Sequence, residues 1–515
     1  MTISPKNLER LRSKVWRITH LYKIKDKDGN LTTFKLNAAQ RKYLLWRGSH
    51  RYNDIIKPRQ KGFTTLHCID MLDDAIWQPG ASCAIIAHER PAVVGIFEIV
   101  KRAFDNMPTE LKPSTKYDNK NELQFISDFQ GRKLDSKIYV AMKLRSGTVT
   151  KLHISEAAYI KNRAELNAGS KQAVGKWGRI TEETTGNGFN DFYDEVISAV
   201  DSWDVDDGIP QEVKKKVFFY SWFDDNEYEL DTPGIEDKTD EEKKLIEKYN
   251  LSDRKIAWRR WKLGELGRSE KTKTGLTPLQ LFKQEYPSNL MEAFQASGNT
   301  FFDQEKVELI TTPLPIEITG YGLKIWHKPI PGHIYIVGVD PSNGKGLDSA
   351  SVNVWDVTPG IEKFVQSAQW HGFMDPYSLA ELVQTVAEYY NKAMASVENN
   401  MITTVLVLSK IYPNIYYTIK IDKKTALPTQ VLGYSTNLKT RPLMMDTFNK
   451  LFQEDLLEVN SLVTKSEMRT FIVKENKKIE HADGKHDDSL FADFIAIATR
   501  DSFPEQVQLS KEALF

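Results

Sequence analysis

Short apolar runs alternate with helical segments along residues 54–160, and this alternation allows few folds. The expected elements, in chain order, are a strand at 54–56, a helix at 64–76, a strand at 83–87, a helix at 90–107 and strands at 137–141 and 151–154. Strands that alternate with helices pair in parallel, and a parallel sheet is covered by helices on both faces. The sequence therefore predicts an α/β domain with a mainly parallel sheet.

A second α/β domain is predicted after a stretch rich in proline and glycine. Residues 311–332 contain four prolines and three glycines, a composition typical of a linker. The expected elements beyond it are strands at 333–340, 350–357 and 395–398, helices at 378–392 and 487–500, and a β-hairpin at 415–436. We therefore expect a first domain at 1–310, with its core at about 30–200 and an acidic helical part at 201–310, and a second domain at 333–515.

Composition excludes some classes of protein but not a nucleic-acid binder. The net charge is zero, yet residues 1–61 hold 16 Lys and Arg against four acidic residues, and residues 201–250 hold 16 acidic residues against seven Lys. A neutral total therefore averages unlike regions. Cys68 and Cys83 are too few for a disulfide framework and favour a reducing compartment. No apolar run approaches the roughly 18–20 residues of a membrane span.

The first candidate site is the turn at residues 57–65, Lys-Pro-Arg-Gln-Lys-Gly-Phe-Thr-Thr, between a predicted strand and helix. Such a turn binds phosphates through backbone N–H groups, a lysine, and a Ser or Thr that holds Mg²⁺. Gly62 and Thr64 fit this pattern, but a phenylalanine stands where the lysine is expected. The possible replacements are Lys57, Arg59 and Lys61. An ordinary basic turn is the alternative interpretation.

A strand that ends in a carboxylate lies further along the chain. Residues 150–156 read Thr-Lys-Leu-His-Ile-Ser-Glu, which places Glu156 where a carboxylate orients an attacking water in many ATPases. Ser155 occupies the position of the usual Mg²⁺-binding aspartate. A solvated strand end is the alternative for Glu156. Gln40 could contact an adenine through its amide, or could be a glutamine on a helix surface.

Acidic residues also follow the predicted strands of the second domain. Asp340 and Glu398 each end a strand, Asp348 lies on a turn, and Asp487 and Asp488 begin the last helix. Carboxylates that converge at one sheet edge can hold two divalent cations about 4 Å apart, which activate water and stabilise the leaving oxygen of a phosphodiester. The alternatives are a turn residue before a proline for Asp340 and a helix cap for Asp487 or Asp488.

Together these motifs resemble the large terminase subunit of tailed double-stranded-DNA bacteriophages, the motor that packages the genome. The matching segments are residues 37–40, 59–64, 153–156, 181–188, 220–223, 258–261 and 284–288. Their order and spacing extend over nearly the whole chain. The resemblance implies an N-terminal P-loop ATPase domain of the ASCE type, followed by a C-terminal RNase H-like nuclease domain.

The resemblance also implies roles for individual residues. The residues expected to bind ATP and its Mg²⁺ are Gln40, Lys57, Arg59, Gln60, Lys61, Gly62, Thr64, Thr65 and Ser155, with Glu156 as the catalytic carboxylate. The segment Thr184, Thr185 and Gly186 would couple hydrolysis to domain movement. Arg145 would act on the ATP of a neighbouring subunit, or is a solvated loop charge. The residues expected to hold two Mg²⁺ or Mn²⁺ ions for the nuclease are Asp340, Asp348, Glu398, Asp487 and Asp488.

The function that the resemblance implies is DNA packaging. ATP hydrolysis would drive double-stranded DNA into the procapsid, and the endonuclease would cut concatemeric DNA. The expected partners are double-stranded DNA, the portal protein, the small terminase subunit and further copies of the chain in a five-membered ring. The expected location is the host cytoplasm during phage assembly, outside the mature virion. The alternatives are a helicase-like or recombination ATPase with a resolvase-type nuclease domain, and a DNA-binding structural protein whose P-loop is inactive.

Overall fold

The computed structural model describes residues 5–144, 147–224, 226–268, 276–294, 299–342, 349–421, 427–474 and 476–502. The chain forms two compact units, Met1–Ser297 and Gly298–Phe515. No helix in the described ranges is long and apolar enough to cross a membrane. Cys68 and Cys83 are both buried and form no disulfide.

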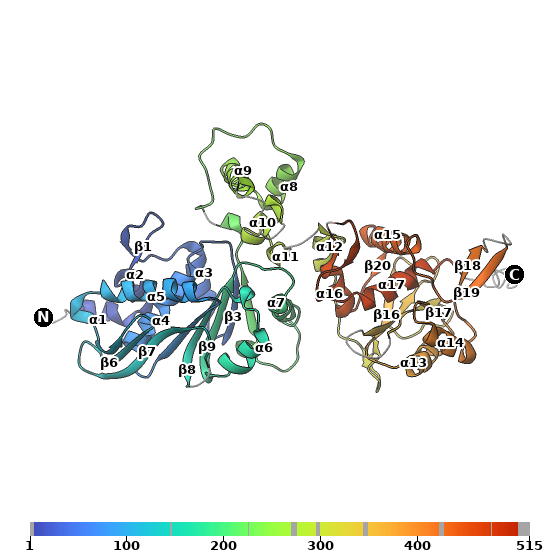
Figure 1. The fold of residues 1–515 in the computed structure, drawn as a ribbon, viewed down its shortest axis with the longest axis horizontal. Coiled ribbons are helices and arrows are strands. Elements are labelled where there is room, and N and C mark those ends of the chain that lie inside the picture. Colours follow the sequence, from blue (N-terminus) through green and yellow to red (C-terminus); the bar gives the residue numbers. More distant parts are fainter. Residues whose placement is uncertain are drawn as a thin grey trace. The chain divides into compact units, whose positions relative to one another are not determined.

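The first unit is built on an eight-stranded sheet with the order β10-β3-β9-β8-β4-β7-β6-β5 (Figure 1). Its strands are β3 (Tyr52–Ile56), β4 (Ser82–Ala87), β5 (Ser114–Asp118), β6 (Glu122–Ser127), β7 (Lys133–Ala141), β8 (Val149–Ser155), β9 (Val174–Thr184) and β10 (Lys215–Phe219). The six strands from β10 to β7 are parallel, and β6 and β5 add an antiparallel edge. The carboxyl ends of β3, β9 and β8 therefore lie side by side.

Helices cover both faces of this sheet, as a parallel sheet requires. Along β4, Cys83 and Ile85 join the core formed with α4 (Phe63–Trp77) and α5 (Arg90–Asp105). The alternate residues Ala84 and Ile86 join a second core with α7 (Asp191–Asp201) and α11 (Leu290–Phe294). The N-terminal part adds α1 (Pro5–Arg12), α2 (Lys14–His20), the hairpin β1 (Lys23–Lys25) and β2 (Leu31–Thr33), and α3 (Ala38–Trp46).

The acidic part of the first unit forms a separate helical layer. It contains α8 (Asp240–Tyr249), α9 (Asp253–Arg268) and α10 (Pro278–Glu285). Its core is aromatic: the rings of Trp222 and Trp258 stack with centroids 5.6 Å apart, and Phe282 packs edge-on against Trp222. Trp222 and Trp258 are buried in this core, whereas the side chain of Trp261 is half exposed.

The second unit is built on a mixed seven-stranded sheet. Its strands are β12 (Glu317–Ile318), β13 (Lys324–Ile325), β14 (Tyr335–Asp340), β15 (Ala350–Asp356), β16 (Phe364–Gly372), β17 (Met394–Val397) and β20 (Leu457–Glu458). Strands β14, β15 and β16 are antiparallel neighbours, and β17 pairs in parallel with β14. The carboxyl ends of β14 and β17 therefore meet at one edge.

Helices also cover both faces of the second sheet (Figure 1). One core contains α13 (Pro376–Tyr389) and α14 (Ile402–Ile411) with Val337 and Val339 of β14. The other contains α15 (Thr440–Gln453), α16 (Leu462–Thr470) and α17 (Asp488–Ala498) with Ile336. Smaller elements are β11 (Asn299–Thr300), α12 (Gln304–Leu309), β18 (Tyr417–Ile421), β19 (Pro428–Leu432), β21 (Phe471–Val473) and β22 (Ile479–His481).

The predicted fold class is confirmed, because both units are α/β and the first sheet is mainly parallel. The hairpin expected at 415–436 is present as β18 paired with β19. The predicted boundary is wrong. The chain divides between residues 297 and 298, and the expected linker at 311–332 contains β12 and β13, which pair in the second sheet. The prolines and glycines there separate short edge strands, and Leu323 and Ile325 are buried in the core.

Candidate functional site

The predicted phosphate loop connects β3 to the N-terminus of α4. Gln60 and Gly62 both have left-handed backbone conformations, with φ of 59° and 75°, which turn the chain sharply before α4 begins at Phe63. Thr64 and Thr65 are half-buried in the first turn of the helix. Unpaired N–H groups and the helix dipole at such an N-terminus attract phosphate. The local backbone therefore has the form of an anion-binding turn.

Helix α3 supports this loop from the side. Its capping box joins Asn37 and Gln40, and the free amide groups of both side chains reach the loop. Asn37 Nδ2 donates to the carbonyl of Lys61 at 3.1 Å, and Gln40 Nε2 donates to the carbonyl of Gly62 at 2.8 Å. A Cβ atom at Gly62 would lie only 2.9 Å from Gln40 Nε2. Gln40 is buried and both its polar atoms are engaged, so a contact with adenine would require these bonds to be replaced.

One of the three candidate cations lies among carboxylates. Lys57 is buried at the end of β3, and its Nζ is 3.4 Å from Glu156 Oε1 and 3.4 Å from Glu183 Oε2. Burial opposes the charge on this lysine, but the two carboxylates outweigh it and raise the pKa of Lys57. Lys57 is therefore a cation held at the carboxyl edge of the sheet.

The other two candidate cations point into the helical layer. The guanidinium of Arg59 makes a two-pronged ion pair with Glu285, and the backbone N–H of Arg59 donates to the carbonyl of the same residue at 3.0 Å. Lys61 is buried with its ammonium 5.1 Å from the ring centroid of Tyr228. Both contacts fix the phosphate loop to residues far along the chain.

Glu156 follows β8 in a strained conformation. Its φ of 53° is left-handed, which is uncommon for a residue with a side chain and often marks a functional position. The second carboxylate oxygen, Oε2, is 3.4 Å from both Thr184 Oγ1 and the backbone N–H of Thr185. Glu156 therefore contacts Lys57 on one side and the predicted coupling segment on the other.

Glu183 is a buried acid of this site that sequence reasoning missed. It lies on β9 directly opposite Ser155 of β8, and its carboxylate accepts hydrogen bonds from the hydroxyls of Thr64 and Ser155. Burial would raise its pKa, but Lys57, His153 and Thr64 lower the pKa of Glu183 well below its usual range. Alternation along a strand could have identified it, because Glu182 and Glu183 must point to opposite faces of the sheet.

The predicted coupling segment connects β9 to the helical layer. Gln284 Nε2 of α10 donates to the carbonyl of Gly186 at 2.9 Å, and the Tyr159 hydroxyl lies 3.4 Å from Thr185 Oγ1. A Cβ atom at Gly186 would lie 1.5 Å from the carbonyl oxygen of Ala293, so only glycine fits there. Arg145, the predicted trans-acting arginine, lies outside the described residues.

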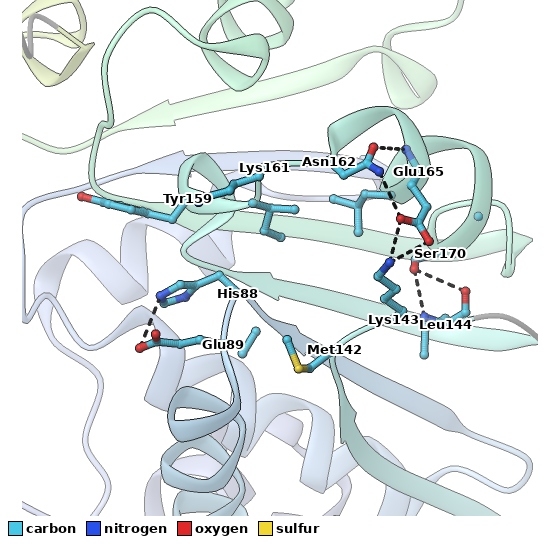
Figure 2. A pocket seen from close by; sticks show the side chains of 14 residues that line it. His88, Glu89, Met142, Lys143, Leu144, Tyr159, Lys161, Asn162, Glu165 and Ser170 are labelled. Atoms are coloured by element: carbon cyan, nitrogen blue, oxygen red, sulfur yellow. Dashed lines mark hydrogen bonds and ion pairs between the residues drawn. The ribbon is translucent and has the colours of Figure 1, made fainter.

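A cavity of about 700 Å³ lies beside Tyr159, at the carboxyl ends of β4 and β7 (Figure 2). Its lining includes Met142, Tyr159 and the ion pair of Lys143 with Glu165, whose charged atoms are 2.7 Å apart. None of the predicted nucleotide-binding residues lines it. The cavity is therefore distinct from the phosphate loop. Tyr159 lines the cavity, and its hydroxyl contacts Thr185.

The predicted metal-binding acids gather at one edge of the second sheet. Asp340 ends β14, and Glu398 follows the parallel neighbour β17, with its N–H donating to Val339 at 3.0 Å. Asp487 occupies the N-cap position of α17 without a capping hydrogen bond from its side chain, and Asp488 begins the helix. Helix α17 lies very close to β14 at Gly338, where a Cβ atom would be 2.1 Å from the carbonyl of Ala492.

The proximity of these acids shifts their pKa values upward. Burial and the charges of Glu398, Asp488 and Asp487 raise the pKa of Asp340 well above its usual value. Burial and Asp487 also raise the pKa of Asp488. Within the described ranges, however, no three acidic, His or Cys side chains are gathered tightly enough to hold one metal ion. Asp348 lies outside the described residues.

Neighbouring side chains orient the acids. Asn400 Nδ2 donates to Glu398 Oε1 at 2.9 Å, and the Ser349 hydroxyl donates to Asp488. His481 lies 3.2 Å from Asp487, and His486 lies 3.9 Å from Asp488. The carboxylate groups fit divalent cations, because hard oxygen ligands suit Mg²⁺ or Mn²⁺ and a cation would relieve their mutual repulsion.

Two further acids of α16 and α17 were not predicted. Glu467 is buried and accepts from the N–H of Leu490 at 2.7 Å, so it caps α17 from a neighbouring helix. Asp493 is fully buried and accepts hydrogen bonds from four side chains. These are Asn353, Trp355, Gln366 and Thr464. Neither position could be identified from spacing, because tertiary packing supplies the partners.

No family model matches the chain. Its structure is similar to the large terminase of bacteriophage HK97, with 11% sequence identity, 95% of this chain and 99% of that chain covered, and a TM-score of 0.40. It is also similar to the large terminase nuclease of thermophilic phage G20c, with 16% identity, 39% of this chain and 98% of that chain covered, and a TM-score of 0.31. The same nuclease with bound magnesium is 15% identical over 39% of this chain and 97% of that chain, with a TM-score of 0.31. The solved structures to which this chain is similar thus include a large terminase and large terminase nucleases.

Proposed function

We propose that this protein is the large subunit of a phage terminase, a motor that hydrolyses ATP to drive double-stranded DNA into a procapsid and cuts concatemeric DNA with a divalent-metal endonuclease. The observation that carries this proposal is the presence of two different sites at two sheet edges in one chain. The first combines a phosphate loop with Lys57 and Glu156. The second combines Asp340, Glu398 and the start of α17.

In the first unit, the backbone N–H groups of the loop and of the first turn of α4 would bind the phosphates of ATP. Lys57 would neutralise phosphate charge, since it is the candidate cation that already lies among the carboxylates. Thr64 would hold Mg²⁺, which supplies positive charge to the phosphates when bound. Glu156 would orient the attacking water. Its ion pair with Lys57 would have to break before it could do so.

The coupling segment offers a physical route from hydrolysis to movement. Glu156 contacts Thr184 and Thr185, and Gly186 lies between Gln284 of the helical layer and Ala293 of α11. A displacement of Glu156 when nucleotide binds would therefore be transmitted to α10 and α11. Arg145 is proposed to complete the ATP site of a neighbouring subunit.

In the second unit, Asp340, Glu398 and Asp488 would hold the divalent ions, with Asp487 and Asp348 as further candidates. Bound Mg²⁺ or Mn²⁺ would activate water and stabilise the leaving oxygen of the DNA backbone. The side chains would close around the ions on binding, since they are neighbours but not yet gathered around one point. This fits an RNase H-like nuclease.

The proposed partners are double-stranded DNA, the portal protein, the small terminase subunit and further copies of this chain in a ring on the portal, in the host cytoplasm during phage assembly. The test compares ATP hydrolysis by the purified protein with procapsids that carry a portal and with forked DNA. A terminase is expected to be stimulated by the procapsids. Stimulation by forked DNA with strand unwinding, and none by procapsids, would contradict the proposal in favour of a helicase.

A further inference from the structure

Strand β8, which Glu156 follows, lacks the acidic residue that usually helps to bind the Mg²⁺ of ATP. Ser155 occupies that place, and a neutral hydroxyl cannot supply the missing negative charge. On the adjacent parallel strand, Glu183 stands at the register position opposite Ser155. The neighbouring strand therefore brings a carboxylate to the place where β8 has none.

The carboxylate of Glu183 contacts both the phosphate loop and β8. Its Oε1 accepts hydrogen bonds from the hydroxyl of Thr64 and, at 3.3 Å, from the hydroxyl of Ser155. Its Oε2 lies 3.4 Å from Lys57 Nζ and makes no hydrogen bond within the described part of the chain. The side chain is completely buried. A buried carboxylate with an unsatisfied oxygen is costly unless another positive group is supplied.

The preceding residue gives an internal comparison. Glu182 is equally buried but points to the other face of β9, where it contacts Arg163, Lys171 and Lys215. These three cations also pair with Glu195 or Asp54, so three cations serve three carboxylates in a structural ion-pair network. Glu183 has one lysine, which it shares with Glu156, and a histidine at 3.6 Å. Glu183 therefore retains negative charge directed at the loop.

We propose that Glu183 is the positioning residue for the Mg²⁺ of the nucleotide, in place of the acid missing at Ser155. Glu183 accepts a hydrogen bond from the Thr64 hydroxyl, which leaves the lone pairs of that oxygen available to the cation. The negative charge of Glu183 also attracts the cation. Glu183 acts through Thr64 and is distinct from Glu156, which is proposed to orient water. This inference rests on the proposed ATPase function.

The competing explanation is that Glu183 only neutralises Lys57. The two explanations differ in what Mg²⁺ does. A simple ion pair predicts that loss of Glu183 changes nucleotide binding equally with and without Mg²⁺. A positioning role predicts a change in the Mg²⁺ concentration needed for nucleotide binding. It also predicts that an acidic residue introduced at Ser155 of β8 restores the wild-type value.

The test uses full-length protein and measures binding of a fluorescent ATP analogue while Mg²⁺ is varied. Glu183→Gln is expected to raise the Mg²⁺ concentration for half-maximal binding about tenfold, because a charge-assisted hydrogen bond to Thr64 is lost. Binding without Mg²⁺ is expected to be unchanged or tighter. The double variant Ser155→Asp with Glu183→Gln is expected to return the midpoint close to that of the wild type.

Glu183→Asp provides a second variant, which keeps the charge beside Lys57 but shortens the reach to Thr64. It is expected to fold like the wild type and to show the same direction of change in the Mg²⁺ midpoint. An unchanged midpoint in Glu183→Asp, or a folded double variant that recovers nothing, would overturn the inference. Failure of the proposed function is a different outcome, in which the wild-type protein binds no nucleotide at any Mg²⁺ concentration.

Discussion

At the scale of single residues, Lys57 illustrates how position decides chemistry. Three basic residues of the phosphate loop could replace the missing lysine, and composition alone does not separate them. The structure pairs Arg59 with Glu285 and places Lys61 against Tyr228. Lys57 remains beside Glu156, at the edge where the phosphates of ATP are proposed to bind.

Asp340 is the residue on which the proposed nuclease depends most. It lies at the end of β14 with Glu398 and Asp488 as charged neighbours, and we propose it as a ligand of the nuclease metal ions. We expect Asp340→Asn to abolish Mg²⁺- or Mn²⁺-dependent nicking of plasmid DNA and to leave ATP hydrolysis unchanged, because the two sites belong to different units. Nicking is measured by conversion of supercoiled to open-circular DNA.

The matched control is Asp446→Asn, which removes an exposed acid on α15 in the same unit. This variant should nick DNA at the wild-type rate. Retention of nicking by a folded Asp340→Asn protein would remove Asp340 from the nuclease site.

At the scale of elements, Gly186 determines how closely the chain after β9 packs against α11. An added Cβ atom would overlap the backbone of Ala293, which cannot move without displacing α11 from the core. Gly186→Ala is therefore expected to lower the free energy of unfolding of the first unit by about 1–3 kcal/mol. Calorimetry of the full-length protein would measure this as a lower melting temperature.

Gly264→Ala serves as the control for that prediction. Gly264 lies on the exposed side of α9, and an added Cβ would have no atom within 4 Å. This substitution should be neutral or stabilising by up to about 1 kcal/mol, because alanine favours helix. Equal melting temperatures for the two variants would show that the contact with Ala293 is not tight.

The sequence allowed most of the elements that carry the sites to be predicted, and it failed where tertiary pairing decides. Alternating apolar runs placed β3, β4 and β8 and the helices between them to within a few residues. The antiparallel edge β5–β6 and the strands inside the expected linker were not anticipated, because short edge strands carry little periodicity.

The site residues likewise divide into those that could be placed from the sequence and those that could not. The motif positions that end a strand, such as Glu156 and Asp340, could be placed from sequence because strand ends share a sheet edge. Glu467 and Asp493 could not, because their roles depend on partners from other helices and strands. Alternation along β9 places Glu182 and Glu183 on opposite faces of the sheet, but the role of Glu183 depends on Ser155 standing opposite it in β8.

At the scale of the whole molecule, the zero net charge has a structural basis. Much of the excess of positive charge at the N-terminus is paired inside the first unit: Arg17 with Asp73, and Lys14 and Arg47 with Asp70. Acids of the helical layer are likewise paired with basic residues of their own layer, as Glu242 is with Arg260. The uneven charge of the sequence therefore supplies ion pairs within the first unit.

We propose that one chain carries an ATPase site and a separate nuclease site. This proposal is tested by the rate of Mg²⁺-dependent ATP hydrolysis by wild-type and Glu156→Gln proteins, each also assayed for nicking. We predict that the wild type hydrolyses ATP, and that Glu156→Gln is slower by at least about 100-fold while nicking DNA normally, because only the carboxylate that orients water is lost. Equal ATPase rates in the two folded proteins, including no hydrolysis in either, would contradict the account.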